Sequence, residues 1–300
     1  MQYSKYNIFS KIRDSENYFI VNLLSGNADI LNRADAVKIE ALRNGESIQD
    51  DGFYNELTEK GYIAEESLER KEYRKKYLDF IDSREKDEIQ IFFVPNYSCN
   101  FACSYCYQDQ YVNKNSEMST ETIDAFFTFV DQKFTGRKKY ITIFGGEPLL
   151  GSQKQKGIIE YIIEKANLTG LELCFVTNGY SLEEYMPLLL KGKIREIQVT
   201  LDGTEKIHDS RRFLKGGGKT FEKISEGIDI CLQNKINVNL RMVIDKDNID
   251  NLPELAGYAM KRGWTLSDYF KTQIGRNYEL HHCQSAPGRL FDRINLYESI

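Results

Sequence analysis

From Ile89 onward, short apolar runs alternate with amphipathic stretches along the chain. The runs are typical of strands buried on both faces of a parallel sheet: IQIFFVP, KYITIFGG, LELCFVTNG, REIQVTLDG and NVNLRMVID. The stretches between them carry apolar residues at helical spacing, and candidate capping residues such as Ser119, Ser181 and Thr220 stand at their starts. This alternation predicts a series of βα units around one parallel sheet.

Five βα units are clear, and DYFKTQI is a candidate sixth strand with RLFDRINLYESI as a helix after it. We therefore expect an α/β fold, a partial (β/α)6 barrel over residues 86–280. An open doubly wound sheet gives a similar pattern and stays an alternative. Residues 281–300 are expected to begin a C-terminal extension, and the helical pattern that runs to the last residue favours a truncated chain.

Residues 1–85 have a different pattern. YNIFSKI and NYFIVNLLSGNADIL predict short strands, and RADAVKIEALRNG and FYNELTEKGYI predict helices that end near glycine. The charged stretch LERKEYRKKYLDFIDSREKDE predicts a solvated connecting helix. Together these elements predict a small winged-helix-like α+β module in front of the barrel.

Charge and hydropathy exclude several classes of partner. The formal net charge of -5 does not favour binding to nucleic acid or to anionic lipid. No apolar stretch is long enough to span a bilayer, and the first residues lack the pattern of a secretory signal. We expect a cytoplasmic protein that binds neither membrane nor nucleic acid.

Three of the six cysteines, Cys99, Cys103 and Cys106, lie in one short loop after the first barrel strand. Thiolates are the ligands that iron–sulfur clusters require, and this spacing can hold three corners of a 4Fe–4S cluster, with one iron left open. Zinc is the alternative, although it needs a fourth ligand and the nearest histidine, His208, lies in another βα unit.

The other cysteines are scattered. Cys174 and Cys231 fall within apolar patterns and are expected in the core, whereas Cys283 follows two histidines and is a conceivable ligand of a second cluster.

The other barrel strands also end in polar or glycine-rich motifs, and the carboxyl ends of such strands converge on one rim. These are Gly145-Gly146-Glu147-Pro148, Thr177-Asn178-Gly179, Thr200-Leu201-Asp202-Gly203 and the strand residue Arg241. Each has a simpler interpretation. The glycine motifs could be tight turns, and Arg211 with Arg212 could be a solvated pair.

The cysteine spacing, with Tyr105 before the last cysteine and GGEP at the next strand end, resembles the radical S-adenosylmethionine (SAM) superfamily from Gln90 to about Ile274. The resemblance implies that the open iron binds the amino and carboxylate groups of SAM. It places Gly145, Gly146 and Glu147 at the SAM amino group. The remaining cofactor-binding candidates, at the ribose, the carboxylate and the nearby rim, are Asn178, Thr200, Asp202, Arg212 and Arg241.

The resemblance also implies an activity. A reduced cluster cleaves SAM to a 5'-deoxyadenosyl radical, which takes a hydrogen atom from the substrate, and a flavodoxin- or ferredoxin-type protein supplies the electron. The N-terminal module resembles the precursor-recognition element of radical SAM maturases. A precursor peptide is therefore the expected partner, and relatives often add a cysteine-rich SPASM extension for auxiliary clusters.

The expected function is modification of a ribosomally made peptide or protein by crosslinking, thioether formation or epimerisation. The alternatives are an anaerobic sulfatase-type maturase and a non-catalytic Fe–S or peptide-binding fragment. A DNA-binding winged helix competes for the N-terminal module, but its mixed charges lack a basic recognition face.

Overall fold

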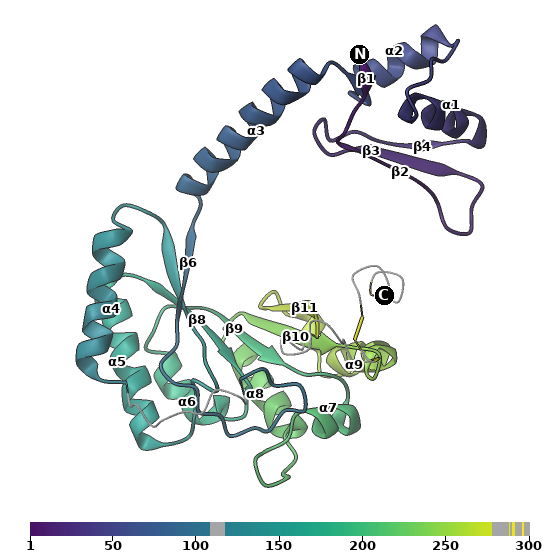
Figure 1. Ribbon diagram of the computed structural model, residues 1–300. Coiled ribbons are helices and arrows are strands. Elements are labelled where there is room, and N and C mark those ends of the chain that lie inside the picture. Colours follow the sequence, from purple (N-terminus) through teal and green to yellow (C-terminus); the bar gives the residue numbers. More distant parts are fainter. Residues whose placement is uncertain (109–117, 278–287, 289, 292–295, 297–300) are drawn as a thin grey trace. The chain divides into compact units, whose positions relative to one another are not determined.

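The computed structural model describes residues 1–108, 118–277, 288, 290–291 and 296. It divides the chain into two compact units, Met1–Asp87 and Glu88–Ile300, which are considered separately (Figure 1). No helix among these described residues is long and apolar enough to cross a membrane. The predicted helix RLFDRINLYESI and Cys283 fall mostly or wholly outside the described residues.

The first unit is built on a three-stranded antiparallel sheet in the order β2-β3-β4. Its elements are β1 (Gln2–Tyr3), β2 (Asn7–Lys11), β3 (Tyr18–Asn22), β4 (Ala28–Leu31), α1 (Arg33–Arg43), α2 (Asp51–Glu59), β5 (Ile63–Ala64) and α3 (Glu66–Lys86). The short strands β1 and β5 form a separate antiparallel pair. Side chains from the sheet and both short helices make a core of their own: Ile20, Leu31, Ile39, Leu57, Tyr62 and Ile63.

The strands and helices of this unit follow the sequence pattern. Asn32 caps α1 by accepting a hydrogen bond from the Asp35 amide, and Asp50 caps α2 in the same way at Phe53. Helix α3 is exposed along most of its length, as its charged sequence predicts. The winged-helix assignment is not confirmed and stays a prediction.

The second unit contains a six-stranded sheet in which every neighbouring pair is parallel. The strands are β6 (Ile89–Phe93), β7 (Lys139–Ile143), β8 (Glu172–Thr177), β9 (Ile194–Thr200), β10 (Val238–Ile244) and β11 (Phe270–Arg276). Their spatial order, β11-β10-β9-β8-β7-β6, follows the chain without reversal. In a doubly wound sheet, this strand order would reverse at a switch point. The partial barrel is therefore confirmed, and β11 is the predicted sixth strand.

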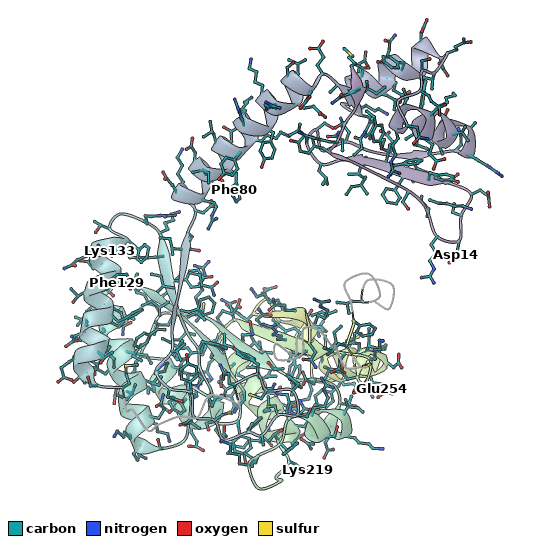
Figure 2. The ribbon with its side chains drawn as sticks, in the orientation of Figure 1. Asp14, Phe80, Phe129, Lys133, Lys219 and Glu254 are labelled. Atoms are coloured by element: carbon teal, nitrogen blue, oxygen red, sulfur yellow. The ribbon has the colours of Figure 1, made fainter. Side chains whose placement is uncertain are left out.

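Helices follow the strands and pack beside one another along the curved sheet (Figure 1). They are α4 (Thr120–Lys133), α5 (Gln153–Thr169), α6 (Leu182–Leu189), α7 (Glu205–Arg211), α8 (Phe221–Gln233) and α9 (Leu252–Lys261), with 3-10 turns η1 (Ile249–Asn251) and η2 (Trp264–Leu266). In α4, Ile123, Phe127 and Val130 recur at helical spacing and are buried. Phe129 lies on another side of this helix, half exposed (Figure 2).

The three predicted capping residues stand at helix starts but differ in use. Ser119 caps α4 by accepting a hydrogen bond from the Thr122 amide. Ser181 and Thr220 occupy the N-cap positions of α6 and α8 without a side-chain cap bond. The Thr220 hydroxyl instead donates to the Arg212 carbonyl at 2.5 Å, beside the site described next.

Candidate active site

A cavity of about 1100 Å³ lies at the carboxyl ends of the barrel strands. One wall is the loop between β6 and α4, which contributes Cys99, Cys103 and Cys106. The opposite walls come from the strand ends, and their predicted site residues are Gly145, Gly146, Asn178, Thr200 and Arg241, joined by Arg212 after α7. Two predicted residues, Glu147 and Asp202, do not line the cavity and lie behind its wall.

The cysteine loop is fixed by main-chain hydrogen bonds to the last residue of α7 and to the segment that follows it. The Ala102 amide donates to the Phe213 carbonyl and the Ser104 amide to the Arg211 carbonyl, both at 2.9 Å. The Phe101 amide turns inward and donates to the Cys99 sulfur at 3.4 Å. A short loop without regular structure thus holds its sulfurs at the cavity.

Gly145 and Gly146 let the base of the cysteine loop approach the end of β7. A Cβ atom at Gly145 would lie 2.2 Å from the Asn96 carbonyl oxygen, and one at Gly146 would lie 2.3 Å from the Ser98 carbonyl oxygen. Gly145 also has a φ of 147° that side chains rarely adopt. The Gly146 amide donates to the Asn96 carbonyl at 3.2 Å, and the next amide donates to Ser98 at 2.8 Å. Both glycines are therefore required by the loop.

Glu147 is 1% exposed, and its carboxylate accepts hydrogen bonds from its own chain. One oxygen accepts from the Thr177 hydroxyl at 2.6 Å and the Leu149 amide at 2.8 Å, and the other accepts from the Asn178 amide at 2.5 Å. Burial raises the pKa of Glu147, and these three bonds oppose the rise. The carboxylate ties the end of β7 to the end of β8. Its contact with SAM stays a prediction.

Asn178 connects β8 to the cysteine loop. Its side-chain amide donates to the Asn100 side-chain oxygen at 2.8 Å and lies 3.9 Å from the Cys99 sulfur. Because the backbone amide of Asn178 is held by Glu147, the GGE motif, the β8 end and the loop form one connected set.

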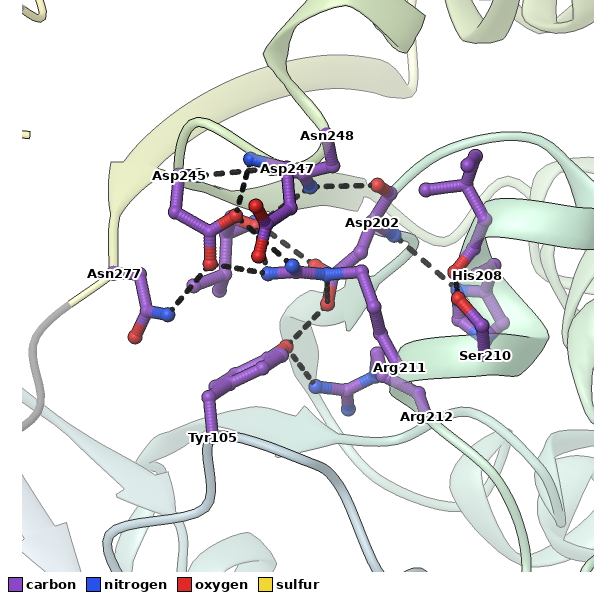
Figure 3. Close-up of polar contacts among 12 residues, drawn as sticks. Tyr105, Asp202, His208, Ser210, Arg211, Arg212, Asp245, Asp247, Asn248 and Asn277 are labelled. Atoms are coloured by element: carbon purple, nitrogen blue, oxygen red, sulfur yellow. Dashed lines mark hydrogen bonds and ion pairs between the residues drawn. The ribbon is translucent and has the colours of Figure 1, made fainter. Parts of the chain in front are cut away.

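Asp202 is the centre of a buried network (Figure 3). Its Oδ2 accepts a hydrogen bond from the Tyr105 hydroxyl at 2.5 Å, and its Oδ1 accepts from the Val243 amide at 3.0 Å. The Tyr105 hydroxyl in turn accepts from Arg212 at 2.7 Å. The aromatic residue between Cys103 and Cys106 therefore joins the cysteine loop to β9 and β10.

Arg211 and Arg212 are not a solvated pair, which corrects that interpretation of the sequence. Arg211 is 7% exposed and binds both oxygens of Asp245 at 3.0 and 3.1 Å (Figure 3). Arg212 packs over the rings of Phe101 and Tyr105 and lines the cavity. A guanidinium removed from water requires anionic or aromatic neighbours. Asp245, after β10, is that neighbour for Arg211, and the two rings of the cysteine loop are those of Arg212.

His208 supports the same region as a neutral side chain. Burial holds its pKa well below the ordinary value, and the nearby arginines act in the same direction. Its Nδ1 accepts from the Asp202 amide at 3.2 Å, so Nε2 carries the proton toward the Thr220 hydroxyl at 3.1 Å. The histidine is a structural link between β9 and α8 and not a candidate ligand.

The three cysteines suit a metal cluster, in which each sulfur binds a different metal atom. Burial raises the pKa of Cys99 to about 11 and also raises that of Cys103, so both thiols are protonated at neutral pH until a metal displaces the protons. Among the residues whose placement is known, no three His, Cys, Asp or Glu side chains converge as ligands of one metal ion. A cubane cluster instead needs each sulfur at a different iron.

The fold and the cavity define a class: a partial βα barrel whose strand ends surround a cysteine-lined site. The sequence model of the Radical SAM superfamily matches residues 93–259, which is more than half of the chain. The chain belongs to this superfamily. It therefore uses a 4Fe–4S cluster and S-adenosylmethionine, which decides between the iron–sulfur and zinc alternatives.

Among curated proteins, the chain is similar to the GTP 3',8-cyclase of Clostridium perfringens (strain SM101 / Type A). The two are 27% identical over 180 residues, which cover 59% of this chain and 53% of the relative. The chain thus spans about half the length of the curated relatives it matches.

Among solved structures, anSMEcpe with bound AdoMet and Kp18Cys peptide matches with a TM-score of 0.59 at 19% identity, over 69% of this chain and 56% of that one. SuiB from Streptococcus suis bound to precursor peptide SuiA matches with a TM-score of 0.52 at 11% identity, over 99% of this chain and 68% of that one. These likenesses show the fold.

Sequence reasoning missed most of the buried network. Arg211, Asp245 and Asn277 were not candidates, yet Asp245 accepts from both Arg211 and the Asn277 side chain. The signal was present, because Asp245 and Asn277 each follow directly after a parallel strand. The rule that polar residues at such strand ends converge would have found both.

Proposed function

We propose that Cys99, Cys103 and Cys106 hold the 4Fe–4S cluster and that SAM binds beside it in the same cavity. The observation that carries this proposal is that residues from five separate strand ends and the cysteine loop line one space. When bound, the cluster supplies the electron for cleavage of SAM to a 5'-deoxyadenosyl radical. The chain binds and orients both groups.

Arg212 is the best placed residue for the SAM carboxylate. It lines the cavity on the side of the cysteine loop, and its charge acts on Cys103, lowering the pKa of that thiol against the effect of burial. Its hydrogen bond to Tyr105 fixes one guanidinium nitrogen, and a planar guanidinium has further donors for a carboxylate. Thr200, at the end of β9, supplies a hydroxyl on the same wall.

The substrate that we propose is a peptide or protein, modified by crosslinking, thioether formation or epimerisation. Two structures with the same fold are known with peptides bound, and the likeness to SuiB extends over nearly the whole chain. The similarity to the GTP 3',8-cyclase covers only 59% of this chain. A nucleotide substrate would leave the N-terminal unit without a role.

The N-terminal unit, residues 1–85 in the proposed division, is the candidate recognition module. Strands β2 and β4 each pair only with β3 among the described strands, so each has one open edge. An extended peptide can add to such an edge through main-chain hydrogen bonds. Residues 86–280 form the barrel in this division, and 281–300 begin an extension.

The test is anaerobic reaction of the reduced enzyme and SAM with a short peptide encoded beside its gene, followed by mass spectrometry. A mass change in the peptide, with formation of 5'-deoxyadenosine, supports the proposal. A change only in a sulfatase-derived peptide assigns the anaerobic sulfatase-type alternative. Absence of SAM cleavage under all conditions would favour the non-catalytic fragment.

A further inference from the structure

The described lining of the cavity is rich in cationic side chains. Four cationic side chains, Arg212, Lys215, Arg241 and Arg276, line it, and no aspartate or glutamate appears among its described lining residues. This contrasts with the whole chain, whose net charge is -5. Glu147 and Asp202 are close by but are held behind the wall by their own hydrogen bonds.

The bound cofactors do not neutralise this charge. A cluster held by the three thiolates would be anionic and would be placed by the cysteine loop on the side of Arg212, whereas SAM carries a sulfonium, an ammonium and a single carboxylate. One carboxylate can pair closely with one guanidinium. If Arg212 receives it beside the cysteine loop, Arg241 is left without an anionic partner among the described lining residues.

Arg241 is held in place without a hydrogen bond at Nε. This nitrogen is buried and has no partner in the described part of the chain. The guanidinium lies against Gly275 of the neighbouring strand, because a Cβ atom there would be only 2.9 Å from Nε and Nη2. A buried guanidinium donor without an acceptor is costly unless a ligand supplies one.

We infer that Arg241 binds an acidic group of the substrate, an aspartate or glutamate side chain close to the residue that is modified. This inference rests on the proposed peptide substrate and names its chemistry. Sequence alone made Arg241 a candidate for SAM, with Arg212 as a second candidate for the SAM carboxylate. Its position over Gly275, with Arg212 at the cysteine loop, assigns the two arginines to different ligands.

The test uses the holoenzyme with SAM and without reductant, so that no turnover occurs. The probes are two fluorescent pentapeptide pools that differ only in a central glutamate or glutamine, and affinity is measured by anisotropy. We expect the glutamate pool to bind about tenfold more tightly, because a charge-assisted hydrogen bond replaces a neutral one. Arg241→Gln should abolish this preference. Gly275→Ala should reduce it by displacing the guanidinium while keeping its charge.

Lys193→Gln is the matched control. It removes an exposed cation that lies just before β9, at the end of this strand that is away from the cavity. This variant should keep the full preference. SAM affinity is measured on each preparation. Loss of SAM binding in Arg241→Gln with the glutamate preference intact would overturn the assignment.

Other outcomes separate this inference from the proposed function. Equal binding of both pools to the unaltered protein would overturn the acidic substrate and leave the peptide substrate standing. Tight, Arg241-dependent binding of GTP, with neither pool bound, would overturn both and indicate a nucleotide phosphate.

Discussion

Two buried carboxylates, Glu147 and Asp202, are the residues on which the strand ends depend. Each accepts hydrogen bonds from a backbone amide of a neighbouring strand end and from a hydroxyl, Thr177 or Tyr105. A buried charge is tolerated only when such donors replace water. Both residues were predicted as cofactor ligands, and their geometry adds a role in holding the strand ends together.

Glu147→Gln tests these two roles. An amide nitrogen in place of one carboxylate oxygen would face a donor from Thr177, Leu149 or Asn178, so we expect the free energy of unfolding to fall by about 1–3 kcal/mol. Because the resemblance places Glu147 at the SAM amino group, we also expect SAM affinity to fall roughly tenfold while the cluster is retained. Denaturant unfolding and SAM titration on one anaerobic preparation measure both. Glu160→Gln, which breaks an exposed pair with Lys191, is the control, and equal stability of both variants would contradict the buried role.

Tyr105→Phe tests the link between the cysteine loop and the network. The substitution removes the hydroxyl that donates to Asp202 and accepts from Arg212. We expect SAM affinity to fall by at least about threefold because Arg212 loses its anchor, with iron content unchanged. Tyr161→Phe is the control. It removes a similar hydrogen bond, from Tyr161 on α5 to Asp124 on α4, and should leave SAM affinity unaltered. Identical SAM affinities in the two variants would remove the positioning role of Tyr105.

At the scale of elements, the sequence predicts the strands well and their side-chain contacts less well. Alternating apolar and amphipathic segments indicated all six strands of the barrel, including Phe270–Arg276. The pattern cannot tell whether a polar residue at a strand end faces the cavity or the wall behind it. The side chains of Glu147 and Asp202 lie behind the cavity wall because hydrogen-bond donors from other βα units are placed there. Those donors are distant in sequence, so the pattern does not reveal them. Arg211 is buried for the same reason, since its partner Asp245 follows another strand.

The two glycines after β7 give a prediction at this scale. Gly146→Ala would bring a Cβ atom within 2.3 Å of the Ser98 carbonyl and 2.4 Å of the Tyr97 carbonyl, and a main-chain segment cannot move aside without carrying the loop with it. We expect lower cluster content and a lower melting temperature. Gly157→Ala in α5 is the matched control, because no atom lies within 4 Å of its added Cβ. That variant should be neutral or stabilised by about 1 kcal/mol through helix propensity. Full iron content in Gly146→Ala would contradict the close approach.

At the scale of the whole molecule, each unit has its own core, which makes separate roles testable. Removal of residues 1–87 should weaken binding of the precursor peptide by at least about tenfold, since an added strand loses its main-chain partners. Formation of 5'-deoxyadenosine should continue, because the cavity is built entirely from residues after Glu88. Fluorescence anisotropy and product analysis measure the two effects. Unchanged peptide affinity would show that the N-terminal unit is not the recognition module.

The central claim is that Cys99, Cys103 and Cys106 hold the cluster with which this chain cleaves SAM. The most direct measurement is iron and sulfide content, together with the EPR spectrum of the reduced protein, for the triple Cys→Ala variant and for Cys174→Ala. Cys174 lies on β8 and does not line the cavity, so its variant should retain the cluster, its spectrum and the spectral change on addition of SAM. We expect the triple variant to lack all three. A full cluster with an unaltered SAM response in the triple variant would contradict the account.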